Sequence, residues 1–237
     1  MSDLEPLQED WERALAVVAH PDDLEYGASG AIARWTAQGK HVAYVLASRG
    51  EAGIDTLPPE EAGPLRAREQ VASAAVVGVD VVEFLDHPDG MIEYGLPLRR
   101  DIAAAIRRHK PDVVLSGNHH ATFPGGFLNM ADHRAVGQAV IDAVRDAANR
   151  WVFRDLDLEP WSGVRFVAVN ASPHAGHAVD VTDTFDLGVA SLREHATYLA
   201  ALSGDMAHPE VFLRRVAEQA GSRFGGRLAT TFEVLVM

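Results

Sequence analysis

Residues 14–30 read ALAVVAHPDDLEYGASG, an apolar run followed at once by a polar turn and then by small residues. The six apolar residues Ala14–Ala19 are far too few for a membrane span, and they are typical of a strand buried on both faces of a parallel sheet. The small residues of 27–38 predict a helix that stops at Gly39. This stretch therefore predicts the first strand–turn–helix unit of an α/β protein.

The same alternation continues along the chain. Further strands are predicted at residues 42–47, 81–85, 113–115, 165–169, 178–181 and 231–236. Further helices are predicted at residues 64–77, 98–109, 132–149, 183–202 and 209–220, with loops at 48–63, 86–95 and 117–129. This order predicts a Rossmann-like, mostly parallel sheet with helices on both faces, in a single domain that spans residues 1–237. Residues 1–12 are expected to form a loose N-terminal arm.

The composition narrows the possible functions. The 237 residues contain 21 Lys and Arg against 34 Asp and Glu, a net charge of −13, which opposes binding to nucleic acid. The chain has no Cys and 11 His, so a metal site must use imidazole and carboxylate ligands. The acidic start MSDLEPLQED is unlike a secretory signal, and no G-x-G-x-x-G follows the first strand. We expect a cytoplasmic protein with a small-molecule partner and no membrane contact. The sequence does not decide whether the protein forms a homo-oligomer.

Ionisable side chains gather where the predicted strands end. Ligands of open parallel sheets bind beyond the carboxyl ends of the strands. Six His lie at or near these ends: His20, His87, His119, His120, His133 and His177. His20 and Asp23 are three residues apart on one turn, so both side chains can converge on one ion, and Asp22 between them suits a general base. Equally, the two Asp residues suit the N-cap and first turn of the following helix.

Residues 19–30 (AHPDDLEYGASG) resemble the AHPDD-x-E-x-x-x-G-G signature of the LmbE-like, PIG-L-type zinc-dependent N-acetylglucosaminyl deacetylases. Weaker resemblances follow in the family's order and extend the match over about residues 13–202. They are Ser48–Gly53 (SRGEAG), Arg66–Glu69 (RARE), Phe84–Gly90 (FLDHPDG), Asp132–Gly137 (DHRAVG) and Arg193–Leu199 (REHATYL).

The resemblance implies an activity and a ligand set. His20, Asp23 and His133 would hold one Zn²⁺ per chain, and Asp22 would act as general base on the attacking water. The substrate would be an N-acetylated amino sugar or a glycosylated small molecule that loses its acyl group. The candidates for binding it are Arg66, His195, Asp89 and Arg49.

One residue departs from the family pattern. The family usually has His-Pro-Asp-His where this chain has Met130-Ala131-Asp132-His133, and Met130 cannot act as oxyanion partner or proton donor. His119 or His120, after the predicted strand 113–115, are the catalytic candidates for this role, and His195 is a further one. Three alternatives remain: a metal-binding member with weak or no deacetylase activity, a thiol-conjugate amidase, and a non-haem iron protein.

Overall fold

The structure is a computed structural model and describes residues 3–237. Eight strands are found in this range: β1 (Glu5–Pro6), β2 (Arg13–Val18), β3 (His41–Leu46), β4 (Val81–Phe84), β5 (Val113–Ser116), β6 (Phe166–Asn170), β7 (His177–Asp180) and β8 (Ala229–Val236). Seven α-helices accompany them: α1 (Ser29–Ala37), α2 (Pro59–Val76), α3 (Leu96–His109), α4 (Ala131–Ala148), α5 (Phe185–Arg193), α6 (Ala196–Ala201) and α7 (Pro209–Gly221). Two short 3₁₀ helices are η1 (Arg154–Leu156) and η2 (Asp205–Ala207).

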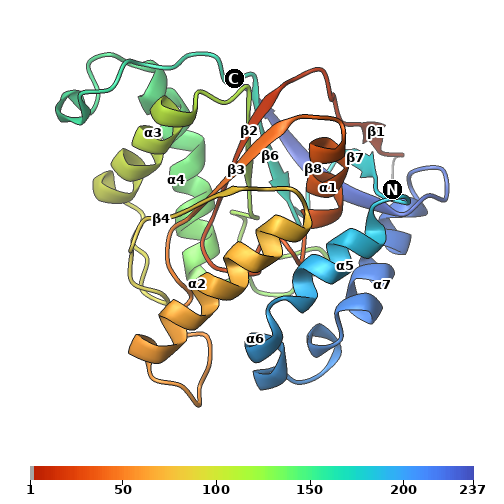
Figure 1. Cartoon of the computed structure of the whole chain (residues 1–237). Helices are drawn as coiled ribbons and strands as arrows, with labels where there is room; N and C mark the ends of the chain where they lie inside the picture. Colours follow the sequence, from red (N-terminus) through yellow and green to blue (C-terminus); the bar gives the residue numbers. More distant parts are fainter. Residues whose placement is uncertain (1–2) are drawn as a thin grey trace.

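The eight strands form one sheet in the order β1-β7-β8-β6-β5-β2-β3-β4 (Figure 1). β8 is antiparallel to both of its neighbours, β6 and β7, and every other pair of neighbours is parallel. The predicted α/β fold with a mostly parallel sheet is thus confirmed. β2 lies between β5 and β3, so the turn that follows it is flanked on both sides by the carboxyl ends of parallel strands.

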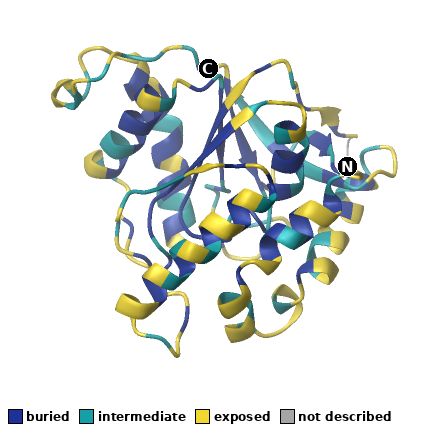
Figure 2. Cartoon of the chain, in the orientation of Figure 1, coloured by how far each residue is buried: buried dark blue, intermediate teal, exposed yellow. Residues whose placement is uncertain are grey.

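Helices cover both faces of the sheet, and the core consequently has two halves (Figure 2). Alternate residues of β2 serve the two halves, because successive side chains of a strand point to opposite faces. Ala16 and Val18 pack in the cluster that contains α1, whereas Leu15 and Val17 pack in the cluster that contains α3 and α4. Burial on both faces explains why β2 is apolar throughout rather than alternating.

The N-terminal segment is packed against the sheet and does not form the loose arm that we expected. β1 pairs with β7, and Glu9 accepts a hydrogen bond of 3.0 Å from Arg34 Nε of α1. Three apolar side chains of this segment are buried: Leu4, Leu7 and Trp11. These three apolar residues indicate packing in the sequence itself, because an arm exposed to solvent gains no stability from apolar side chains. Residues 1–2 of the predicted arm lie outside the described range.

Some helix boundaries differ from the prediction. α2 begins at Pro59, so Pro64 lies inside the helix rather than at its start. The Glu60 carbonyl that loses its donor there belongs to the exposed first turn, where the solvent can bond it. The helix predicted at residues 183–202 is divided into α5 and α6 near His195. Among residues 3–237, none of the helices combines the length and the apolar character that crossing a bilayer demands.

Candidate active site

The turn after β2 carries three of the residues predicted for the site. Asp23 Oδ2 accepts the backbone N–H of Ala19 at 3.0 Å and that of His20 at 2.9 Å, so its carboxylate is fixed on the turn. Asp22 has a φ of 87°, a region that Asp tolerates better than most residues. Its backbone N–H donates to Gln70 Oε1 of α2 at 3.1 Å. The turn thus fixes the carboxylate of Asp23 and the backbone of Asp22 next to each other at the carboxyl edge of the sheet.

The first turn of α4 brings His133 to the same point. His133 Nε2 lies 2.9 Å from Asp23 Oδ1 and 3.2 Å from His20 Nδ1. The donor atoms of His20, Asp23 and His133 all lie within 4.8 Å of one another. The structure therefore brings together the three side chains that the resemblance implied as ligands.

The outward ring nitrogens of both histidines are held by acceptors. His20 Nε2 is 3.0 Å from Asp89 Oδ1 and 3.2 Å from Asp132 Oδ2, and His133 Nδ1 is 3.0 Å from Asn129 Oδ1. Carboxylate and amide oxygens only accept, so in a neutral ring these nitrogens carry the proton. The lone pairs of His20 Nδ1 and His133 Nε2 are then directed at Asp23. Two imidazoles and one carboxylate, each backed by an outer partner, fit a divalent transition metal such as zinc.

The charges around this centre favour a cation. Burial opposes a charged His20, but its hydrogen bonds to Asp132, Asp23 and Asp89 outweigh burial and raise the pKa of His20 well above its usual value. Burial opposes the charged form of Asp23 as well, yet His133 and His20 hold the pKa of Asp23 well below its usual range. Positive charge is therefore strongly preferred at this point, whether a proton or a metal ion supplies it.

Arg66 holds Asp22 in place. Its guanidinium is buried and donates to Asp22 Oδ2 at 2.6 Å, to the Pro21 carbonyl at 2.7 Å and to the Gly50 carbonyl at 2.9 Å. Burial raises the pKa of Asp22 to about 6, although the charge of Arg66 opposes this rise. Both terminal nitrogens of Arg66 are thus bonded within the protein, whereas its buried Nε has no hydrogen-bond partner within residues 3–237. The substrate-binding role of Arg66 stays a prediction.

Two other predicted substrate-binding residues are also turned inward. Asp89 is buried and accepts from His20 and from the Ala52 N–H at 2.8 Å, so it supports the histidine. His195 is 0% exposed, with its Nε2 3.6 Å from Glu25 Oε2. The substrate-binding roles of Asp89 and His195 stay predictions. Arg49 is the one that stays near the surface, with a side chain that is 40% exposed and paired with Asp86.

A second group of imidazoles lies at the same edge. His120 Nε2 is 2.7 Å from Glu233 Oε2 of β8, and the ring of His119 lies 4.0 Å from that of His120. Asn129 connects the two groups, because its side-chain amide donates to the His120 carbonyl at 2.9 Å while its Oδ1 faces His133. Met130, which stands where the family pattern has His, lies at the N-cap of α4 and is 52% exposed.

The comparison with known proteins identifies the family. Residues 15–144 match the family model PIG-L, described as GlcNAc-PI de-N-acetylase. The chain belongs to the PIG-L family. The chain is 28% identical to the diacetylchitobiose deacetylase of Thermococcus kodakarensis, over 93% of this chain and 82% of that protein.

Other proteins to which the chain is similar are deacetylases as well. A 1D-myo-inositol 2-acetamido-2-deoxy-alpha-D-glucopyranoside deacetylase of a Mycobacterium species is 25% identical, over 88% of this chain and 82% of that one. The solved N,N'-diacetylchitobiose deacetylase of Pyrococcus horikoshii superposes with a TM-score of 0.85 at 26% identity, covering 96% of this chain and 85% of the other. These homologues are LmbE-like deacetylases of N-acetylated sugars.

Three residues that the sequence did not predict form hydrogen bonds to the predicted site residues. Asn129, Gln70 and Glu233 were not predicted, although Glu233 stands out as a charged residue within the apolar strand TFEVLV. Asp132 does not cap its helix, because Met130 has the N-cap position. The Asp132 carboxylate instead accepts the backbone N–H groups of Gly90 at 2.7 Å and Ile92 at 3.2 Å, together with His20.

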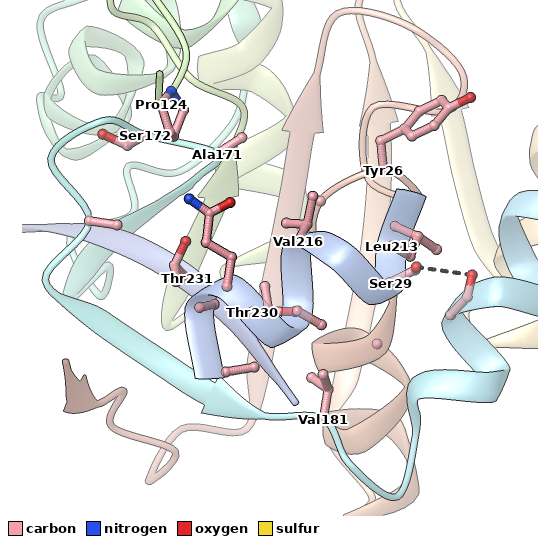
Figure 3. A pocket seen from close by; sticks show the side chains of 18 of the residues that line it. Tyr26, Ser29, Pro124, Ala171, Ser172, Val181, Leu213, Val216, Thr230 and Thr231 are labelled. Atoms are coloured by element: carbon pink, nitrogen blue, oxygen red, sulfur yellow. Dashed lines mark hydrogen bonds between the residues drawn. The ribbon is translucent and has the colours of Figure 1, made fainter. Parts of the chain in front are cut away.

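A cavity of about 390 Å³ lies elsewhere in this PIG-L protein, and no residue predicted for the site lines it. Figure 3 shows Pro124, Ala171 and Ser172 on one side of it, with Leu213 and Val216 of α7 and Val181 on others. Its walls are largely apolar and carry no cluster of ionisable groups that could activate water. The chemistry of the side chains, rather than the volume of this cavity, therefore locates the site at the His20–Asp23 turn.

Proposed function

We propose that this protein is a zinc-dependent deacetylase that hydrolyses the acetamide of an N-acetylated amino sugar, free or within a glycoconjugate. The observation that carries the proposal is the convergence of His20 Nδ1, Asp23 and His133 Nε2, with the carboxylate of Asp22 next to them on the turn. The deacetylase relatives support the class of substrate.

Zn²⁺ held by His20, Asp23 and His133 would supply Lewis-acid chemistry, which acidifies water and polarises an amide carbonyl. Asp22 is the proton acceptor for the attacking water, because it is a carboxylate beside the ligand set that makes no contact with His133. A pKa of about 6 leaves Asp22 ionised at neutral pH but more basic than an ordinary carboxylate. Arg66 keeps that carboxylate oriented through the 2.6 Å contact.

His120 is the proton donor to the leaving amine in place of the residue lost at Met130. In the imidazolium form of His120, Glu233 accepts from Nε2, which leaves the proton on the other ring nitrogen for transfer to the amine. The amide C–N bond breaks, the water oxygen remains on the acyl carbon, and the proton goes to nitrogen. The products are acetate and a free amine.

The test is an acetate-release assay on zinc-loaded protein with N-acetylglucosamine, diacetylchitobiose and N-acetylglucosaminyl conjugates. Asp22→Asn should lower kcat by about 10²–10⁴-fold, the usual contribution of a general base. Asn tolerates the positive φ at residue 22 and still offers an oxygen to Arg66, so the fold should survive. Metal content and the melting temperature are measured alongside turnover.

Asp155→Asn is the matched control, because Asp155 is an exposed carboxylate of η1 paired with Arg100 and should leave turnover unchanged. Turnover that persists undiminished in Asp22→Asn would refute the general-base assignment. If wild-type protein binds zinc but releases no acetate from any of these substrates, the metal-binding alternative suggested by Met130 replaces the proposal. Cleavage of thiol-conjugate amides alone would favour the amidase.

A further inference from the structure

Three side chains outside the His20–Asp23–His133 centre form a second set of metal-type donors. They are His119 and His120, in the loop after β5, and Glu233 on β8. One ligand atom of each lies within 4.8 Å of the others. We call these three residues the distal cluster.

The distal cluster is compact and rich in imidazole. The rings of His119 and His120 are 4.0 Å apart and tilted by 37°, and His120 Nε2 lies 2.7 Å from Glu233 Oε2. The ring of His174 lies beside this cluster, with its centroid 4.6 Å from that of His120 and the two rings nearly perpendicular. Two imidazoles and a carboxylate are ligands that suit zinc, copper or nickel rather than magnesium or calcium.

One nitrogen of the distal cluster is left without a partner. His119 Nδ1 is buried and finds no hydrogen bond within residues 3–237. A buried polar atom in this state costs about 1–3 kcal/mol. Burial and the neighbouring His120 also lower the pKa of His119, which favours the uncharged form of the ring that a metal ligand requires. A metal ion bound at His119 Nδ1 would give this nitrogen the partner that it lacks.

The scaffold around the distal cluster is already in place. Glu233 Oε2 accepts the Ser172 hydroxyl at 2.5 Å, and the Ser172 hydroxyl accepts the His174 N–H at 3.0 Å. The backbone N–H of His120 donates to Asn118 Oδ1 at 3.0 Å. Residues from three separate segments are therefore held together before any ion arrives.

We propose that His119, His120 and Glu233 form a second site for a divalent transition-metal ion, distinct from the His20–Asp23–His133 centre. The ion would occupy an imidazole that the proposed function needs as a proton donor. Filling the distal cluster should therefore inhibit hydrolysis, and this consequence rests on the proposed function, whereas the binding itself does not.

The test is the metal content of the full chain at graded free Zn²⁺, measured by equilibrium dialysis without substrate. Wild-type protein should bind a tight first equivalent and a weaker second one. His119→Ala/Glu233→Gln should lose only the weaker equivalent, and His133→Ala should lose only the tight one. Binding of Co²⁺, followed by its visible absorption, repeats the count with a spectroscopic signal.

His41→Ala is the control for adventitious binding, because His41 is exposed at the start of β3 and should leave both equivalents intact. A single equivalent in the wild type at saturating Zn²⁺, or two equivalents retained by His119→Ala/Glu233→Gln, would overturn the proposal. If the double variant is unfolded by circular dichroism, His119→Gln replaces it and is read in the same way.

Turnover at the Zn²⁺ concentrations that fill the second equivalent separates the two proposals. A fall in wild-type turnover over that range is expected. If the second equivalent binds and turnover is unchanged, the metal site stands and the proton-donor role of His120 fails.

Discussion

The His20–Asp23–His133 centre and the distal cluster use the same kinds of ligand but differ in what stands behind them. Each histidine of the centre has its outward nitrogen held by an acceptor: Asp89 and Asp132 hold His20, and Asn129 holds His133. In the distal cluster, Glu233 has an outer partner in Ser172, but the ring of His119 makes no hydrogen bond within residues 3–237 that would hold it in place.

Because the ligand types are alike, this difference in preorganisation is what predicts the order in which the two sites bind metal. Outer partners fix the tautomer and the ring orientation before the ion binds, and removing one typically costs about 10–100-fold in affinity. We therefore expect the centre to bind first and the distal cluster only at higher metal concentration.

The largest effect is expected from Asp23→Asn, which removes the only anionic ligand of the three in the centre. Breaking a buried charged pair costs about 3–5 kcal/mol, and this corresponds to about 10²–10⁴-fold in affinity. The tight equivalent in equilibrium dialysis should weaken by that amount and hydrolysis should fall with it, while the second equivalent is unchanged. An undiminished tight equivalent would show that Asp23 is not a ligand.

An intermediate effect is expected from Asp132→Asn, which keeps an oxygen for the Gly90 N–H but removes the charge that faces His20. The first equivalent should bind about 10–100-fold more weakly in competition with a chelator, because an outer partner is lost. The second equivalent serves as the internal control. Equal weakening of both would mean that Asp132 supports the whole edge rather than the centre.

The smallest effect is expected from Gly137→Ala in α4. A Cβ at this position would lie 2.7 Å from His119 Cβ, so the side chain of His119 must move. Such overpacking costs about 1–3 kcal/mol, and the better helix propensity of Ala returns up to about 1 kcal/mol. The second equivalent should weaken about tenfold, as 1.4 kcal/mol implies, with less change in the first.

Gly117→Ala is its matched control, because a Cβ there meets nothing within 4 Å although the residue directly precedes the loop of the distal cluster. Both variants are compared by dialysis and by melting temperature. If Gly117→Ala weakens the second equivalent as much as Gly137→Ala, contact with His119 is not the cause.

The sequence allowed the fold and the centre of the site to be predicted, because both depend on local patterns. The apolar run before His20 marks a central strand, and the spacing of His20 and Asp23 on one turn is fixed by that turn. The partner His133 came from the resemblance rather than from spacing. The ligand set remains a prediction, although the structure brings its members together.

What could not be predicted depends on the direction in which side chains face. Arg66, Asp89 and His195 are polar residues beside the site, yet all three are buried. Arg66 and Asp89 are hydrogen-bonded to the protein, whereas the ring nitrogens of His195 make no hydrogen bond within residues 3–237. A residue type does not reveal whether its polar atoms are already bonded. Glu233 lies 100 residues beyond His133, and only the antiparallel pairing of β8 with β6 brings it to the same edge.

The short strand β1 has a consequence for association between molecules. An uncovered edge strand offers a row of N–H and C=O groups to which another chain can add. β1 covers the outer side of β7 with only two residues, and one of them, Pro6, has no N–H to offer. At the opposite edge, β4 carries Glu83 bound to Arg108 and His109, which places charge where a foreign strand would pair. If β1 separated from β7, the edge of β7 would be open to pairing with another chain. We therefore expect the segment around Pro6 to limit aggregation.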